Sequence, residues 1–262
     1  MSVDSGNVNG PAATAYWQSL PLGRGVSLLK VDENGLAAFA KPAGVLSHPN
    51  ERGDEPRSLL TARYVLDGEF FEWAVDGSAQ PARLWLLNRL DSATSGVILV
   101  ASDGELAAAI RAEFKRKQVR KLYHALVFGS PRQPIELWRD RLAVEKRQGV
   151  IRTASGAGHI PAECRMSVVR ASRGEPRLAL LKLEPRTGRS HQLRVQCAKR
   201  MLPIVGDQTY GNFAANREFA KHTGLKRMFL HSVATSFDYE WRGRQSSFSA
   251  EASLPEEFLR FV

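Results

Sequence analysis

Short runs of alternating apolar and polar residues predict that strands make up most of this chain. The runs are bounded by Gly, Pro, Asn or Asp, which commonly end strands. The first two runs flank the turn-forming segment 32–35 and therefore predict a hairpin. The strand candidates are Val26–Val31, Gly35–Lys41, Arg83–Leu87, Val97–Ala101, Leu122–Val127, Met166–Val169, Leu178–Leu183, Met228–Ser232 and Ser247–Ala250.

Helices are predicted at fewer places. Ser102 and Glu105 fit a capping box at the start of a helix. The apolar face of this helix is formed by residues four positions apart, which are Leu106, Ile110 and Phe114. Ser190 is expected to cap a second helix, His191–Met201, and Ser58–Leu66 is expected to form a short third helix.

The order of these elements predicts the fold class. Strands and helices are mixed without a βαβ rhythm, which favours α+β, with a mixed and mostly antiparallel sheet flanked by helices. Residues 1–25 are expected to be a disordered tail, because their first part is small and polar. Residues 26–262 are then expected to form a single domain. The glycines of Gly206–Gly211 do not have the spacing of a nucleotide-binding loop.

The charge of the chain is strongly basic and clustered. It contains 37 Lys and Arg against 27 Asp and Glu, a net charge of +10. Residues 111–147 hold eleven basic and four acidic side chains, and residues 186–200 hold five basic ones and no acid. Clustering favours a phosphate-bearing partner such as RNA. A solvated basic face is the alternative.

The remaining composition limits the class of protein. There are only two cysteines, Cys164 and Cys197, too few for a secreted disulfide scaffold or a cysteine-rich zinc site. No apolar run is long enough for a membrane span, and the first twenty residues do not form a signal peptide. We therefore expect a cytoplasmic protein that does not bind membranes.

One polar loop lies between two apolar runs and carries a candidate catalytic residue. Asp91 follows the run 83–87 closely, and the run 97–101 begins six residues later. Two buried strands would hold such a carboxylate firmly. Thr94, Ser95 and Gly96 can supply hydroxyls and a tight turn. A simple loop aspartate that hydrogen-bonds its own backbone is the alternative.

Several segments, in order along the chain, resemble the RluA-type pseudouridine synthases. The loop matches their HRLDxxTSG signature, except that Asn88 stands where the family commonly has His. The chain is also similar to compact members that lack an S4 RNA-binding domain. The other matching segments are Lys41–Gly44 with His48, Arg120–Tyr123, Arg186–Val195, Pro203–Gly211 and Leu230–Ser232.

The resemblance implies a pseudouridine synthase fold with a central cleft, and a reaction that isomerises uridine to pseudouridine in ribosomal or transfer RNA. It implies no cofactor and no metal, and we expect a monomer. Asp91 would be the nucleophile acting on a flipped uridine, with Arg194 as the cation that keeps it charged. Tyr123 would stack on the uracil and relay a proton. The expected substrate-binding residues are Arg89, Thr94, Arg189, His191, Gln192 and Leu230.

Three other functions are consistent with parts of the sequence. A catalytically silent RNA-binding protein would keep the basic clusters but would not need Asp91, Tyr123 and Arg194 together. A hydrolase could use Ser95, but the chain has no GxSxG motif and Ser95 has no evident His and Asp partners. A basic structural protein of the ribosome would not need a catalytic loop.

Overall fold

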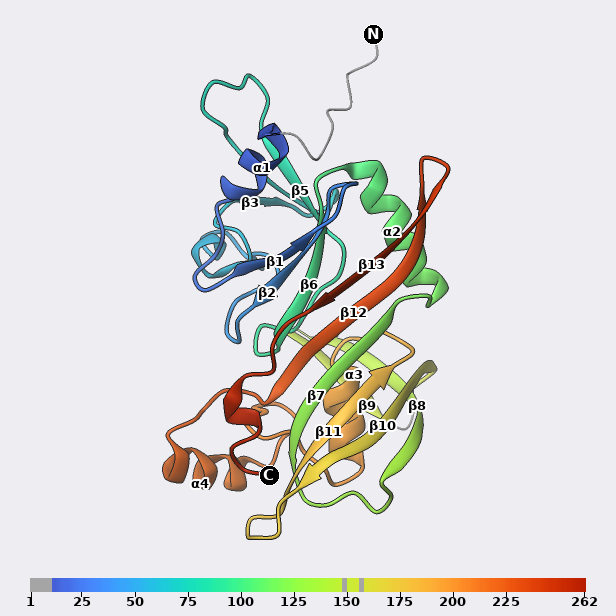
Figure 1. Cartoon of the computed structure of the whole chain (residues 1–262). Helices are drawn as coiled ribbons and strands as arrows, with labels where there is room; N and C mark the ends of the chain where they lie inside the picture. Colours follow the sequence, from blue (N-terminus) through green and yellow to red (C-terminus); the bar gives the residue numbers. More distant parts are fainter. Residues whose placement is uncertain (1–10, 148–149, 156–157) are drawn as a thin grey trace. The chain divides into compact units, whose positions relative to one another are not determined.

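The computed structural model describes residues 11–147, 150–155 and 158–262, which form two compact units. Unit 1 comprises residues 1–92, 97–118 and 237–250, and unit 2 comprises residues 93–96, 119–236 and 251–262. The chain therefore passes between the units several times (Figure 1). The sequence pattern did not predict this division within residues 26–262.

Unit 1 is built from strands and one long helix. Strands β3, β4 and β5 pair antiparallel in that order, β5 pairs with β6, and β6 also pairs with β2. The hairpin predicted around residues 32–35 is confirmed, because β1 and β2 pair antiparallel. The elements of this unit are α1 (Pro11–Gln18), β1 (Ser27–Val31), β2 (Leu36–Lys41), η1 (Glu55–Arg57), β3 (Arg63–Val65), β4 (Phe70–Trp73), β5 (Ala82–Leu86), most of β6 (Ser95–Ala101), α2 (Gly104–Arg116) and β13 (Arg244–Glu251).

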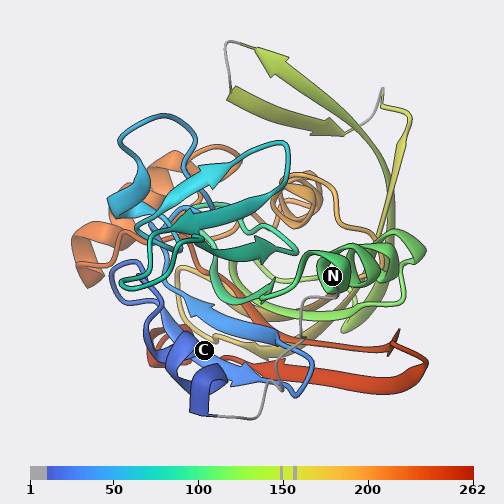
Figure 2. The ribbon, with the colours of Figure 1, turned by 90° about the horizontal axis from the view of Figure 1, so that it is seen from above.

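Unit 2 is a sheet with the strand order β12-β7-β11-β10-β8-β9. These neighbours pair antiparallel, whereas the first residues of β6 pair with β12 in parallel. The β8–β9 hairpin, in yellow-green, lies at the top of Figure 2. The elements are β7 (Arg120–Phe128), β8 (Ile135–Arg147), β9 (Val150–Ser155), β10 (Ile160–Ala171), β11 (Leu178–Pro185), α3 (Gln192–Lys199), α4 (Phe213–Thr223), the first part of β12 (Leu230–Trp241) and η2 (Glu256–Phe258).

The core of unit 2 lies between the strands and α3. Leu193 and Cys197, on the inner face of α3, pack in one hydrophobic cluster with residues of β7, β10 and β11. Both side chains are buried. The two cysteines are free thiols, and burial raises the pKa of Cys164 to about 12. The strand and helix content places the protein in the α+β class, as predicted.

The predicted helix over residues 58–66 is wrong. The backbone of this segment pairs instead with residues 21–23, where Thr61 N donates to Pro21 O at 2.7 Å and Gly23 N donates to Leu59 O at 2.8 Å. These bonds between distant segments take the donors and acceptors that a helix would use within itself. Leu59 and Leu60 are fully buried in this arrangement.

The predicted disordered tail is too long. Residues 1–10 lie outside the described residues, but residues 11–18 form the helix α1, and Trp17 within it and Leu20 just after it are buried. The Tyr16 hydroxyl also donates to the carbonyl of Arg83 at 2.6 Å. Burial of these large side chains outweighs the polar character of the preceding residues.

The helix caps differ from those predicted. Asp103, not Ser102, caps α2, since its carboxylate accepts a hydrogen bond from Leu106 N. Ser190 does not cap α3; the N-cap is His191, with a left-handed backbone at φ 55°. The sequence pattern missed α4, although Asn212 caps it and Gly224 ends it.

Gly96 is required where β6 meets β12. Its φ of +113° is a conformation that side chains rarely adopt, and a Cβ there would lie 2.1 Å from the carbonyl oxygen of Ser232. The glycine of the TSG sequence is thus explained by the close approach of two backbones. It fixes where the loop after Asp91 enters the sheet of unit 2.

We expect Gly96→Ala to lower the free energy of unfolding by about 2–5 kcal/mol, because backbone strain and overpacking add. Urea unfolding monitored by tryptophan fluorescence checks this. Gly174→Ala is the matched control, since a Cβ at Gly174 meets nothing within 4 Å and should change stability by less than about 1 kcal/mol. Equal stability of the two variants would contradict the role given to Gly96.

Candidate active site

Asp91 lies in a loop of unit 1 whose backbone is held immediately before it. The Ser47 hydroxyl donates to the Leu90 carbonyl at 2.7 Å and accepts from Leu90 N at 3.0 Å. Ser47 and Leu90 are buried, whereas Asp91 itself is half-buried. The loop is therefore anchored by a buried neighbour while its aspartate reaches the surface.

The backbone is also held immediately after Asp91. The Ser92 carbonyl accepts from Gly44 N at 2.8 Å and from the Lys41 ammonium at 3.1 Å. Lys41 is 1% exposed and donates further to the carbonyls of Pro42 and Val45. This buried cation gathers carbonyl oxygens around the loop, which gives a physical reason for the KPxG segment.

Asn88 and Arg89 have different roles in this loop. The Asn88 amide oxygen accepts from the backbone N of Leu99 at 2.8 Å, so the side chain ties the loop to β6. Arg89 is exposed, and one of its guanidinium nitrogens is 3.5 Å from Nε2 of His48. The His48 ring stacks on Tyr64 with ring centres 4.7 Å apart. The departure at Asn88 therefore falls on a side chain that positions backbone.

Tyr123 and Leu230 lie in unit 2, on neighbouring strands. Tyr123 is on β7 and Leu230 on β12, and both belong to the hydrophobic cluster that includes Leu193. Leu230 is 4% exposed, whereas Tyr123 is half-buried at the margin of the cluster with Ala93. The two side chains therefore contribute to one apolar cluster of unit 2.

Arg194 forms a buried ion pair with Asp207. Its Nε and one terminal nitrogen donate to the two carboxylate oxygens at 2.7 and 2.8 Å. The side chains are 8% and 1% exposed. Burial acts to raise the pKa of Asp207, but the hydrogen bonds and charge of Arg194 outweigh it, so the pKa is lowered from 3.8. A two-pronged pair of this kind fixes the plane of the guanidinium.

Asp207 also shapes the loop that carries it. One carboxylate oxygen accepts from the backbone N of Thr209 and of Tyr210, at 2.8 and 3.0 Å. Asn216 of α4 also binds this loop. Its amide oxygen accepts from Gly206 N at 2.7 Å, and its amide nitrogen donates to the Asp207 carbonyl at 2.9 Å. The loop is therefore held both by its own carboxylate and by α4.

Gln192 is buried and holds the turn before α3. Its amide oxygen accepts from the Thr187 hydroxyl at 2.7 Å and from Arg189 N at 3.2 Å, while its nitrogen donates to the Glu163 carbonyl at 3.1 Å. Gln192 is thus a positioning residue for the turn. Arg189 remains exposed at the end of that turn, with its Nε donating to the Pro161 carbonyl.

His191 is half-buried and is linked to Tyr210. Its Nδ1 lies 2.8 Å from the Tyr210 hydroxyl, which also accepts from the backbone N of Thr153 at 2.9 Å. The hydroxyl that accepts from Thr153 still has its own hydrogen to donate to His191. Tyr210 further faces Arg194, whose guanidinium lies 5.1 Å from the ring centre.

Ser95 has a histidine partner that the sequence did not reveal. Its hydroxyl lies 2.8 Å from Nδ1 of His231 and accepts from the guanidinium of Arg227. Because Arg227 only donates, the hydroxyl hydrogen goes to His231, whose Nε2 then donates to the Ala252 carbonyl. Ser95 and His231 are both 3% exposed, and the second ring nitrogen meets a carbonyl, so this pair is structural.

Burial and this network affect the protonation of His231. The pKa of the ring is lowered from 6.5 to about 4, mainly by burial; the hydrogen bond to the Ala252 carbonyl acts to raise it, and the nearby positive charge of Arg227 acts to lower it. Arg227 itself pairs with Glu257 near the end of the chain at 2.9 Å. Thr94, the neighbour of Ser95 in unit 2, is only 2% exposed and is therefore buried.

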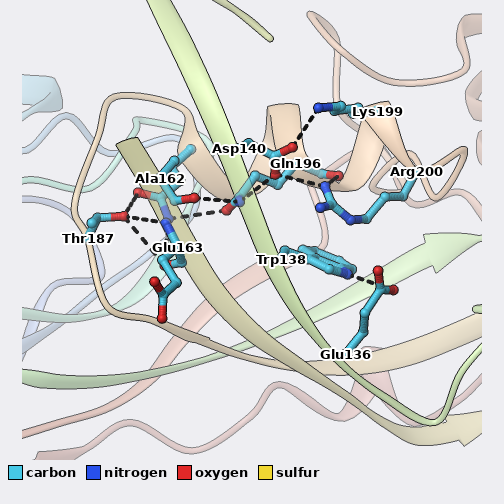
Figure 3. A network of polar contacts seen from close by, with 10 residues as sticks. Glu136, Trp138, Asp140, Ala162, Glu163, Thr187, Gln196, Lys199 and Arg200 are labelled. Carbon is cyan, nitrogen blue, oxygen red and sulfur yellow. Dashed lines mark hydrogen bonds and ion pairs between the residues drawn. The ribbon is translucent and has the colours of Figure 1, made fainter. Parts of the chain in front are cut away.

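Much of the basic segment 186–200 is used within the protein. Lys199 and Arg200 donate to Asp140 at 2.7 and 2.9 Å, as Figure 3 shows, and the Arg200 guanidinium lies 4.6 Å from the ring centre of Trp138. Burial acts to raise the pKa of Asp140, but these bonds and one from Gln196 lower it. Two of the five basic side chains of this segment, Lys199 and Arg200, are therefore paired with an internal carboxylate.

The structure distributes the predicted site residues over the two units. Asp91 and Arg89 belong to unit 1. Within unit 2, the structure connects Tyr123 and Leu230 through one apolar cluster, and Arg194 and His191 through Tyr210. In the part of the chain that the structure describes, no helix is long and apolar enough to cross a membrane. The same residues contain no group of three potential metal ligands.

Solved structures define the class of protein to which this fold corresponds. Human RNA Pseudouridylate Synthase Domain Containing 1 aligns over 98% of this chain and 89% of its own, with a TM-score of 0.64 and 18% identity. Human RNA Pseudouridylate Synthase Domain Containing 4 aligns over 95% and 94%, with a TM-score of 0.63 and 22% identity. The fold is that of a pseudouridylate synthase domain.

The sequence match identifies the family. Residues 35–199 match the family described as RNA pseudouridylate synthase. The chain belongs to this family and is an RNA pseudouridine synthase.

The curated relatives carry two kinds of name. The tRNA pseudouridine synthase C of Vibrio cholerae serotype O1 is 28% identical over 244 residues, covering 84% of this chain and 94% of that protein. The protein of the same name from Pasteurella multocida is 30% identical, over 78% and 82%. The ribosomal large subunit pseudouridine synthase C of Vibrio vulnificus is 32% identical over 60% of this chain and 48% of its own.

The sequence analysis missed several residues that hold the site in place. Asp207 and Tyr210 lay within a recognised motif but received no role, and their spacing alone gives no sign of an Arg194 partner. Asn216 lies in the helix that was missed. His231 lay within the matching segment 230–232 but received no role, because its contact with Ser95 joins residues 136 positions apart.

We expect Asp207→Asn to lower the free energy of unfolding by about 3–5 kcal/mol, because it leaves the buried charge of Arg194 without its carboxylate. Urea unfolding at neutral pH measures the change. Asp238→Asn, at an exposed carboxylate, should change it by less than about 1 kcal/mol.

Acid titration tests the same pair in the wild-type protein. The pKa of Asp207 is lowered, so its contribution is complete above the ordinary value of 3.8 and is lost as the pH falls through the lowered pKa. The Asn variant should lose less stability than the wild type over that acid range. Parallel curves for the two proteins would contradict this account of Asp207.

We expect His231 to make stability fall between pH 6.5 and about pH 4. Below 6.5 the unfolded chain binds a proton that the folded ring does not bind, so acid favours unfolding, on the order of 3 kcal/mol in all. Unfolding free energies measured at several pH values check this, and His231→Asn should flatten the curve. An unchanged slope in the variant would contradict the lowered pKa.

Proposed function

We propose that Asp91 is the nucleophile with which this enzyme converts uridine to pseudouridine. The observation that supports this most directly is the anchoring of the loop. Both neighbours of Asp91 are held, Leu90 by Ser47 and Ser92 by Lys41 and Gly44, while the aspartate stays accessible. A carboxylate that must meet a reacting atom benefits from a fixed backbone of this kind.

The chemistry sets the demands on the site. The bond between ribose C1′ and uracil N1 breaks, the uracil turns, and a bond forms between C1′ and C5. The C5 proton then leaves, and N1 gains one. The target base has to leave its stack before a side chain can reach it. Asp91 acts on the ribose or on the base, and each route requires its carboxylate to be ionised.

The other residues serve binding and positioning. Tyr123 stacks on the uracil and relays a proton, and Leu230 lines the apolar side of the base. Arg194, whose guanidinium plane is fixed by Asp207, supplies positive charge to the reaction. Arg89 enters the space left by the flipped base, which agrees with its exposed position.

Arg189 contacts RNA phosphate from the end of its turn. Gln192 positions this turn through its hydrogen bonds to Thr187 and Arg189. His191 positions Tyr210, and Thr94 supports the loop after Asp91. These three side chains act on RNA through their neighbours, since Gln192 and Thr94 are buried.

Transfer RNA is the substrate that we propose. The relatives named tRNA pseudouridine synthase C match over most of both chains, whereas the ribosomal relative matches over 48% of its own length. We also propose that the protein acts in the cytoplasm as a monomer, without cofactor or metal. Mapping pseudouridines across total RNA from cells with and without the protein identifies the target; sites that change only in ribosomal RNA would refute the tRNA assignment.

We expect Asp91→Asn to reduce pseudouridine formation at least about a thousand-fold, because the amide is a poor nucleophile. Tritium release from RNA labelled at uracil C5 measures the reaction, since C5 loses its hydrogen. The dissociation constant for RNA should stay within about two-fold. Asp67→Asn, at an exposed aspartate, is the control and should be fully active. Full activity of Asp91→Asn would overturn the assignment.

A further inference from the structure

Unit 2 contains a groove beside α4 that the reaction does not use. Its volume is about 890 Å³, and it lies between α4 and the loop that carries Asp207. Gly206 and Gln208, the neighbours of Asp207, form part of its wall. Helix α4 is drawn in orange in Figure 1.

The charged residues that line the groove are all basic. They are Arg217 and Lys221 on α4 and Lys226 just beyond it, and all three are exposed. Among the described residues, none of the three lies within ion-pair distance of a carboxylate. The acidic residue of α4, Glu218, pairs instead with His222 at 3.3 Å and does not line the groove. Three such cations on one wall favour phosphate groups.

An exposed aromatic ring lies in the same groove. Phe213, the first residue of α4, is 51% exposed although it is large and apolar. An exposed ring beside basic side chains is how proteins bind single-stranded nucleic acid, because bases stack on the ring while cations follow the backbone. A folded duplex offers no free base face to such a ring.

We propose that this groove binds a single-stranded segment of the RNA substrate, with Phe213 stacking on a base and Arg217, Lys221 and Lys226 contacting phosphates. The inference rests on the proposed function, in that the RNA is the substrate modified at Asp91. The bound segment touches the loop that holds Arg194, because Gly206 and Gln208 belong to both. The groove therefore adds affinity for the RNA, and Asp91 carries out the reaction.

The test is the triple variant Arg217→Ala, Lys221→Ala, Lys226→Ala. Its dissociation constant for unmodified tRNA should rise at least about 30-fold, and the slope of log affinity against log salt should become shallower by about 2. Its single-turnover rate at saturating RNA should stay within about two-fold of wild type. Circular dichroism and the melting temperature establish that it is folded.

A matched control separates the groove from general charge. Arg165→Ala, Arg170→Ala, Arg173→Ala removes the same charge from exposed positions on β10 and the turn after it. This variant should lose no more than about five-fold in affinity. Equal losses in the two triple variants, or unchanged binding in the groove variant, would overturn the proposal.

Phe213 provides an independent measurement. Phe213→Leu keeps an apolar side chain but removes the ring, and should weaken binding of a short unstructured oligoribonucleotide about five-fold or more. Phe213→Tyr keeps the ring and should bind like wild type. Equal binding by all three proteins would refute the stacking role.

These outcomes are distinct from those that test the reaction itself. If Asp91→Asn is active, the assignment of the nucleophile fails while the binding results for the groove stand. If Asp91→Asn is inactive but the groove variant binds RNA normally, only the groove proposal fails. A groove variant that binds normally and loses its single-turnover rate also overturns the proposal, because the residues would then affect the reaction and not binding.

Discussion

The buried ion pair between Arg194 and Asp207 is the interaction on which most of unit 2 depends. An unpaired charge in this position would be costly, so the two side chains constrain each other strongly. One carboxylate oxygen of Asp207 also accepts hydrogen bonds from the backbone N–H groups of Thr209 and Tyr210. Asn216 attaches the same loop to α4. Asp207 thereby links Arg194 to α4, through its carboxylate on one side and its backbone carbonyl on the other.

In unit 1, the loop that carries Asp91 is fixed by hydrogen bonds from a buried lysine to backbone carbonyls. Lys41 donates to three carbonyls, including that of Ser92, and Ser47 satisfies both backbone groups of Leu90. The backbone on either side of Asp91 therefore has little freedom, and Asp91 itself is half-buried. The residues around the aspartate therefore fix the position of its backbone.

The distribution of charge shows that a basic segment is not the same as a basic surface. Lys199 and Arg200 neutralise the buried Asp140, and Arg194 neutralises Asp207. By contrast, Arg217, Lys221 and Lys226 do not form a dense run in the sequence, yet they meet along one groove. Cations that are already paired with buried carboxylates have less charge to offer a polyanion, so we expect the second group to matter more for RNA than the first.

The sequence by itself determined the strands around residues 32–35, the α+β class, the RNA-modifying family and the loop that carries Asp91, because these follow from local periodicity and from motifs contiguous in the chain. Only the tertiary structure decided that residues 58–66 pair with 21–23, that His231 pairs with Ser95, and that Gln192 is buried. Each of these depends on hydrogen bonds or burial between distant segments. Local pattern carries no information about partners that only folding brings together.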